Sequence, residues 1–323
     1  MQKFAFNTTK GNVAPELLAP SSIVACNAKP PIQRTSALTC QNTNSQNLPT
    51  PVHPTKLNNL LLGYDSQKLQ YLIDGFMHGF HLGYTGPPLS SISKNHKSTN
   101  NFPSVISDFI SEGITNNRIA GPFPSPPFQH FISSPLGVVP KSEQGKYRVI
   151  QDLSFPKHNS VNDHIPQENS SVQYESIDNV TALLNQFGKD SLMAKTDIKD
   201  AFRIIPIHPE DYKLLGFSWE GAFYYDKCLP MGASSSCQIF ESLSQALQWA
   251  MYSKFNAAGM SHMLDDFFFI GPKHSQKCLQ DLNQFIYMCE ESGIPIKMEK
   301  TVFPTTIITI YGIEVDSNAM VCR

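Results

Sequence analysis

The stretch Met263-Leu264-Asp265-Asp266-Phe267-Phe268-Phe269-Ile270 places two adjacent carboxylates between two apolar segments. Those segments, residues 259–264 and 267–271, have the length and composition of β-strands, so we predict a hairpin with the acids at its tip. Carboxylates held this close repel each other unless a cation neutralises them. Taken alone, the pair is explained better by a solvated turn, so a chemical role depends on companion motifs elsewhere in the chain.

A third acid lies at the end of another apolar strand, predicted over residues 194–198, in the sequence Lys195-Thr196-Asp197-Ile198. Burial of Asp197 there would be costly without a cation as its partner. Three carboxylates brought together offer the hard oxygen ligands that Mg²⁺ prefers. Two such ions, roughly 3.5–4 Å apart, can activate a 3′-hydroxyl and stabilise a leaving pyrophosphate. The pattern therefore favours nucleotidyl transfer, the chemistry of polymerases.

The companion motifs are present, and together with the acids they resemble a reverse transcriptase. In chain order they are a fingers hairpin (SPLGVVPK at 134–141 and GKYRVIQDLS at 145–154), motif A (197–202), motif B (LPMGASSS, 229–236), motif C (264–266), motif D (GIPIKMEK, 293–300) and motif E (YGIEVD, 311–316). The closest resemblance in sequence is to the retrotransposons that use a tyrosine recombinase, the DIRS-like group. It lies in the fingers segments, including RVIQDLSFP and SVNDHI, and in the upstream Gly-Phe and Gly-Pro-Phe segments.

The resemblance implies the residues of a metal site. Asp197 and Asp265 would ligate two Mg²⁺ ions, with Mn²⁺ as an alternative, Asp266 would complete the carboxylate cluster, and the Ile198 carbonyl would add an oxygen. It also implies that Lys300 is the acid for the departing pyrophosphate. The neighbouring Lys297 could serve instead, and a solvated lysine at a helix end is the plainer interpretation.

The resemblance also implies a site for the incoming dNTP. Lys141 and Arg148 would hold the triphosphate, although a solvated hairpin would look the same. Phe202 would stack under the sugar and exclude a 2′-hydroxyl, or would belong to the core. Met231 occupies a motif B position that often holds Gln or Phe, and Gly232 would allow close backbone approach to nucleotide or template, or would be a turn glycine.

Motif E supplies a further implied contact, since Tyr311 and Gly312 would lie near the primer terminus. A buried tyrosine on a strand explains these residues equally well. Met263 departs from the tyrosine that often precedes motif C. None of these departures removes a metal ligand.

The implied fold is α+β, with the fingers and palm of a right-hand polymerase and an antiparallel sheet packed on helices. We expect no thumb, since the chain ends just after motif E. The predicted parts are a disordered polar arm (1–55), a helical N-terminal segment and linker (56–102), and fingers and palm (103–323), with fingers at about 103–190 and part of 205–228, and palm at about 191–204 and 229–323.

Hydrophobic spacing predicts the individual elements of this fold. The predicted helices are 57–80, 103–114, 177–186, 238–252 and 276–292, and the further predicted strands are 136–140, 147–152, 223–228 and 307–315. A proline-rich segment at 121–127 should be extended.

The whole-chain composition limits the partners and the compartment. The 25 Lys and Arg against 27 Asp and Glu residues give a net charge of −2, so any nucleic acid must be held by a local patch. Seven cysteines without a C-x-x-C pair indicate reduced thiols in an intracellular protein, in the cytoplasm or nucleus. No signal peptide or apolar run of roughly 20 residues is present, so no membrane is expected.

Two functions of different classes fit these observations. The first is an RNA-directed DNA polymerase core of a retroelement, in truncated form, acting on an RNA or DNA template with primer and on dNTPs, with thumb, ribonuclease H or recombinase segments missing. The second is a catalytically inactive relic that binds nucleic acid. The intact acids favour the enzyme, because such a cluster has no structural reason to exist. An RNA-dependent RNA polymerase is disfavoured by the bulk of Phe202.

Overall fold

The computed structural model describes residues 48–141 and 145–323, which belong to one compact unit. Most of the predicted disordered arm, residues 1–47, lies outside the described residues. Its last residues are ordered: Val52 is buried, and the Thr50 hydroxyl donates to the Ile204 carbonyl at 2.6 Å. Disorder over 48–55 was therefore a wrong prediction, because this segment packs against the core.

A four-stranded antiparallel sheet, the palm sheet, carries the acids of the sequence motifs. Its strands, in spatial order, are β11 (Val302–Thr305), β6 (Leu192–Asp197), β10 (Asp266–Gly271) and β9 (Gly259–Met263). The run Phe267-Phe268-Phe269-Ile270 is fully buried, which explains why it is apolar at every position rather than at alternate ones. The predicted hairpin at 259–271 and the strand before Asp197 are confirmed.

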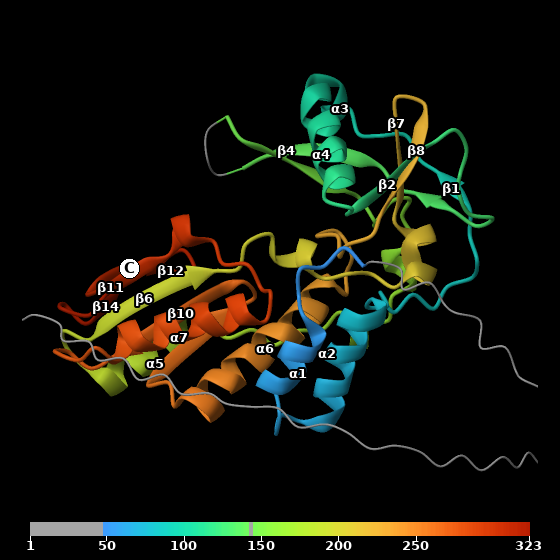
Figure 1. Ribbon diagram of the computed structural model, residues 1–323. Helices are drawn as coiled ribbons and strands as arrows, with labels where there is room; N and C mark the ends of the chain where they lie inside the picture. Colours follow the sequence, from blue (N-terminus) through green and yellow to red (C-terminus); the bar gives the residue numbers. More distant parts are fainter. Residues whose placement is uncertain (1–47, 142–144) are drawn as a thin grey trace, which may run out of the picture. The chain divides into compact units, whose positions relative to one another are not determined.

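Helices pack on this sheet because alternate side chains of β10 point to opposite faces. Phe267 and Phe269 belong to the largest apolar cluster, with α6 (Ser236–Phe255) and α7 (Lys277–Glu291). Helix α7 contacts β6 and β10, as Figure 1 shows for β10, and α6 contacts β9. Phe268 and Ile270 belong to a second cluster with α5 (Ile177–Phe187) and a three-stranded sheet. That sheet consists of β12 (Ile307–Ile310), β13 (Ile313–Asp316) and β14 (Val321–Cys322).

A five-stranded sheet and a separate two-stranded hairpin are formed by strands between residues 91 and 226. The five-stranded sheet has the order β1 (Ser91–Ile92), β3 (Ile132–Ser133), β7 (Gly216–Trp219), β8 (Ala222–Asp226) and β2 (Ile119–Phe123). The pairs β1–β3 and β3–β7 are parallel, so this sheet is mixed, unlike the palm sheet. The hairpin of β4 (Leu136–Pro140) and β5 (Tyr147–Gln151) packs against α3 (Ser98–Asn101) and α4 (Pro103–Thr115).

Two predicted elements were wrong because each is interrupted by a turn. The predicted helix 57–80 is two helices, α1 (Pro54–Leu60) and α2 (Ser66–His78), since Gly63 has a φ of +92° and Asp65 caps α2 by accepting from the backbone N–H of Gln67 and Lys68. The predicted strand 307–315 is the hairpin β12–β13. The other predicted helices and strands agree with the structure to within a few residues at their ends.

Short 3-10 helices fill several connections: η1 (Asn162–His164), η2 (Gln167–Asn169), η3 (Ala201–Ile204), η4 (Pro209–Leu214) and η5 (Met298–Lys300). Within 48–141 and 145–323, no helix combines the length and apolarity needed to cross a bilayer. The cysteines in that part of the chain are free thiols.

Candidate active site

The three acids converge at one end of the palm sheet, as predicted. Asp197 is the last residue of β6 and Asp266 the first of β10, and the two are directly opposite in the antiparallel register. Residues so paired project from the same face, with Cα atoms about 4.5–5.5 Å apart. Asp265 lies in the adjoining turn, where its carbonyl accepts from the backbone N–H of Ile198 at 3.1 Å. Two strand ends and one turn therefore bring the carboxylates together.

The turn that carries Asp265 contains two residues between the paired Met263 and Asp266. Its first residue, Leu264, has a φ of +54°, a left-handed conformation that costs a non-glycine residue about 1–3 kcal/mol. The Ser244 hydroxyl of α6 donates to the Leu264 carbonyl at 2.8 Å. The helix thus helps to hold a strained turn in place.

Burial and repulsion by a neighbouring carboxylate make Asp265 and Asp266 reluctant to ionise. Burial, followed by the negative charge of Asp197, raises the pKa of Asp265 to about 6. The same two causes raise the pKa of Asp266, and the charges of Lys195 and Lys300 oppose that rise. A bound cation would remove this repulsion, so the electrostatics suit a metal site.

Lys300 forms an ion pair with Asp197. Its Nζ donates to Asp197 Oδ2 at 3.0 Å, and this hydrogen bond raises the pKa of Lys300, whose side chain is about half exposed (53%). Lys297 contacts Asp197 through its backbone N–H, which donates to the Asp197 carbonyl at 2.8 Å. Of the two lysines considered in motif D, the structure therefore brings the ammonium of Lys300 to the acids.

The acids fit a hard divalent cation in donor chemistry, since all offer carboxylate oxygens. The buried Ile198 follows Asp197 directly, so its backbone lies beside the same cluster. The oxygens of the three acids do not all lie within 4.8 Å of one another, so joint coordination requires rotation of side chains.

The neighbours of Gly232 leave no room for a side chain at this position. A Cβ at this position would lie 2.3 Å from the Gln151 carbonyl oxygen. Asn162 holds the same loop, donating to the Gly232 carbonyl at 2.9 Å and accepting from the Ser234 N–H at 2.9 Å. The close approach is therefore to the fingers segment, whereas the side chain of the adjacent Met231 is largely exposed (64%).

Lys141 and Arg148 lie on one face of the β4–β5 hairpin. Arg148 is opposite Val139, and the Lys141 N–H donates to the Lys146 carbonyl at 2.8 Å, so positions 139, 141, 146 and 148 share a face by the two-residue alternation. The opposite face, with Tyr147, packs against the α4 cluster. Lys141 and Arg148 are both exposed.

Phe202 lies in η3 and is nearly buried (8% exposed). Its ring centroid is 5.2 Å from that of Phe240 on α6, within the largest apolar cluster. The residue is thus a core aromatic that follows Asp197 by one short turn, and this placement is compatible with both interpretations given above.

Tyr311 and Gly312 form the two-residue turn of the β12–β13 hairpin, with φ of +52° and +81°. Positive φ at both positions is typical of a type I′ turn, which accounts for the glycine. The Tyr311 hydroxyl lies 3.0 Å from the Ser261 hydroxyl on β9, and burial raises its pKa. The tyrosine therefore lies at a turn rather than along a strand.

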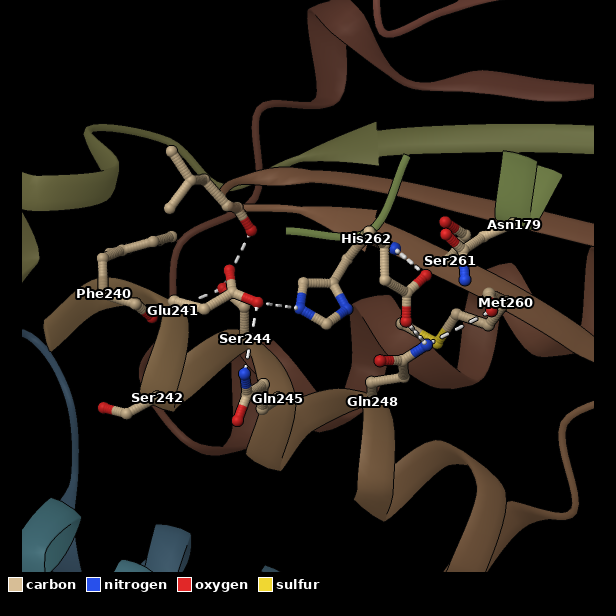
Figure 2. Close-up of polar contacts among 12 residues, drawn as sticks. Asn179, Phe240, Glu241, Ser242, Ser244, Gln245, Gln248, Met260, Ser261 and His262 are labelled. Carbon is tan, nitrogen blue, oxygen red and sulfur yellow. Dashed lines mark hydrogen bonds and ion pairs between the residues drawn. The ribbon is translucent and has the colours of Figure 1, made fainter. Parts of the chain in front are cut away.

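A buried polar pair behind the motif C hairpin was not found in the sequence. Glu241 Oε1 of α6 lies 2.9 Å from His262 Nε2 of β9 (Figure 2). Both side chains are almost completely buried. Glu241, Ser244 and Gln248 share one face of α6, because they are three and four residues apart. This polar stripe, which lies beside the apolar face of Leu243, Ala246, Leu247 and Ala250, was the available signal.

Comparison with known proteins places the chain in a family. The sequence profile described as reverse transcriptase (RNA-dependent DNA polymerase) matches residues 139–315. The Pro-Pol polyprotein of simian foamy virus type 1 is 25% identical over 164 residues, covering 50% of this chain and 12% of that protein. The Pro-Pol polyprotein of feline foamy virus is 22% identical over 222 residues, covering 68% and 17%. The chain thus spans less than a fifth of these relatives.

Solved structures share the fold. A foamy viral protease-reverse transcriptase in complex with double-stranded DNA has a TM-score of 0.59 at 16% identity, covering 81% of this chain and 46% of that one. The foamy viral protease-reverse transcriptase with an RNA/DNA hybrid has a TM-score of 0.55 at 17% identity, covering 81% and 35%. Since the family profile matches more than half of the sequence, and the acids converge on one sheet end, this chain belongs to the reverse transcriptase family.

Proposed function

We propose that this chain catalyses RNA-directed DNA synthesis by two-metal nucleotidyl transfer. The observation that carries the proposal is the convergence of Asp197, Asp265 and Asp266 at one end of the palm sheet, with Lys300 hydrogen-bonded to Asp197. Relatives of the same fold are described in complex with double-stranded DNA and with an RNA/DNA hybrid, which supports a primer-template as the partner.

Asp197, Asp265, Asp266 and the Ile198 carbonyl would hold two Mg²⁺ ions, or Mn²⁺ in their place. Reverse transcriptases are generally dependent on divalent metals. When bound, the ions supply activation of the primer 3′-hydroxyl and stabilisation of charge on the leaving pyrophosphate. The chain itself contributes a rigid frame for the ligands, because two of them end paired strands and the third lies in the turn that Ser244 anchors.

Lys300 would give a proton to the departing pyrophosphate. The hydrogen bond to Asp197 keeps its amine protonated, and its half-exposed side chain can reach a ligand while staying near the acids. Lys297 is less suited, because its contact with Asp197 runs through the backbone.

The fingers would hold the triphosphate through Lys141 and Arg148, which share an exposed face of the β4–β5 hairpin. Phe202 would select the deoxyribose, and the loop with Met231 and Gly232 would contact nucleotide or template. The exposure of Met231 supports such a contact.

Tyr311 and Gly312 would contact the primer terminus from the β12–β13 turn. The Tyr311 hydroxyl reaches β9, one strand of the hairpin that carries Asp265, which supports a position close to the acids. We further propose that the source is a retroelement of the DIRS-like group, on the wording of residues 134–165, and that thumb, ribonuclease H or recombinase segments act with this chain in the cytoplasm or nucleus.

Primer extension on an RNA template tests this proposal. Asp265→Asn should lower the incorporation of dNTPs by orders of magnitude, because it removes a shared ligand. The matched control is Asp108→Asn on the exposed side of α4, which should extend primers like the wild type. Equal extension by Asp265→Asn and wild type would refute the proposal. Binding of primer-template without extension by any variant would instead identify an inactive nucleic-acid-binding relic.

A further inference from the structure

Two histidines and a glutamate from distant parts of the chain meet away from the three acids. His81 follows α2, whereas His208 and Glu210 lie at the start of η4. Among residues 48–141 and 145–323, this is the one group of three potential ligand residues whose ligand atoms all lie within 4.8 Å of one another. The imidazole ring centroids of the two histidines are 4.1 Å apart, with the planes tilted by 31°.

The backbone fixes this arrangement before any ligand binds. The Phe80 N–H donates to the Pro206 carbonyl at 2.8 Å, and the His208 N–H donates to the Phe80 carbonyl at 2.9 Å, which forms a parallel bridge beside the histidines. The two segments approach so closely at Gly79 that a Cβ there would lie 2.4 Å from the His208 backbone nitrogen. Both histidine backbones are therefore held rigidly, which lowers the entropy cost of assembling a site.

Asp211 gives His81 the environment of a metal ligand. Its Oδ2 lies 3.2 Å from His81 Nδ1 and also accepts from the Leu82 N–H at 2.8 Å. Its side chain is only 13% exposed, so the carboxylate is fixed in this position. A carboxylate that accepts from Nδ1 selects the tautomer whose Nε2 is free to bind a metal, and metal-binding histidines usually donate in this way to a carboxylate, a backbone carbonyl or water.

His208 is prepared in a different way. Its Nδ1 accepts from the Glu210 backbone N–H at 3.3 Å, a long hydrogen bond that a metal ion at this nitrogen would replace. Glu210 Oε2 lies 4.0 Å from His208 Nδ1 and is largely exposed, so it can rotate to complete a ligand set. Two imidazoles and one carboxylate form a common three-ligand set for zinc, with a water in the fourth position.

We propose that His81, His208 and Glu210 bind a divalent transition-metal ion of the zinc class, with Asp211 orienting His81. Imidazole nitrogens favour Zn²⁺, Co²⁺ or Ni²⁺ over Mg²⁺, which prefers oxygen ligands. The site is therefore chemically separate from the aspartate cluster and does not depend on the proposed function. A bound ion would join the segment after α2 to the start of η4, which are 130 residues apart at His81 and Asp211.

Calorimetric titration of the purified chain with Zn²⁺, and visible absorption on titration with Co²⁺, test the proposal. We expect one zinc-class ion per chain, unaffected by excess Mg²⁺. His81→Ala and His208→Ala should each weaken binding by about tenfold or more, and Asp211→Asn by roughly 10–100-fold. The matched control is His130→Ala, a histidine of the loop before β3, which should bind like the wild type.

Thermal unfolding gives an independent measurement. Zn²⁺ should raise the melting temperature of the wild type and of His130→Ala, but not that of His81→Ala, because an ion bound only to the folded chain stabilises it. Glu210→Gln, at a largely exposed position, covers the case in which His208→Ala fails to fold. No zinc binding by the wild type, or equal binding by the wild type and His81→Ala, would overturn the proposal.

Discussion

Asp265→Asn should stabilise the protein in EDTA while abolishing its proposed activity. Burial and the charge of Asp197 raise the pKa of Asp265 from 3.8 to about 6. Each tenfold change in proton affinity corresponds to about 1.4 kcal/mol, so ionising this carboxylate in the folded chain costs about 3 kcal/mol relative to the unfolded chain. Asparagine carries no charge and avoids this cost.

The sign of the pH dependence follows from the direction of that change. The folded chain holds the Asp265 proton more tightly than the unfolded chain, so the contribution of this residue to stability falls as pH rises from about 4 through about 6. The full cost is present above that window. The advantage of Asp265→Asn over the wild type should therefore be greatest at neutral pH and small near pH 4.

Urea unfolding at several pH values, with EDTA, measures the difference. We expect Asp265→Asn to raise the free energy of unfolding by up to about 3 kcal/mol at neutral pH, and the exposed Asp108→Asn to change it little. Addition of Mg²⁺ should stabilise the wild type more than Asp265→Asn, because the ion binds only the folded site. A variant no more stable than the wild type at neutral pH would show that the carboxylate is not destabilised by its neighbours.

Three further changes test other parts of the site. His262→Leu should lower the free energy of unfolding by about 3–5 kcal/mol, because it leaves Glu241 buried without the histidine. The double change Glu241→Leu/His262→Leu should recover part of that loss in urea unfolding. If the effects of the two single changes simply added, the pairing would be contradicted. Gly232→Ala should cost about 1–3 kcal/mol, because its Cβ would meet the Gln151 carbonyl, and an unchanged urea midpoint would contradict this. Phe202→Val should raise the ratio of ribonucleotide to deoxyribonucleotide incorporation in primer extension; an unchanged ratio would leave Phe202 as a core residue only.

The palm was predictable because its local signals agree with its tertiary environment. The apolar run after Asp266 is long enough for one strand and is buried on both sides, so sequence pattern and burial coincide. The acids are identified by their place at strand ends, and the antiparallel register then brings Asp197 opposite Asp266. Their roles in metal binding still rest on the resemblance and on the proposal above.

Other features were missed for physical reasons. Tyr311 adopts a positive φ in a turn where Asn or Asp is more usual, so residues 307–315 look like one strand in sequence. Strands β1 and β3 have two residues each and show no periodicity. The contact between His81 and Asp211 depends on segments far apart in the chain, which local pattern cannot pair. The break before α2 did carry a signal, the cap at Asp65.

Helix α6 also restricts where residues can be inserted into or deleted from this chain. Glu241 and Ser244 are about one helical turn apart, and both contact the β9–β10 hairpin. Glu241 contacts the His262 side chain, and Ser244 donates to the Leu264 carbonyl. Insertion of a single residue between them would rotate one side chain by about 100° about the helix axis relative to the other, so both contacts could not form together. Insertions and deletions should therefore be tolerated better at places such as the β7–β8 turn, where Glu220 and Gly221 are exposed. Between residues 241 and 244, the two contacts therefore constrain the spacing of the side chains as well as their identity.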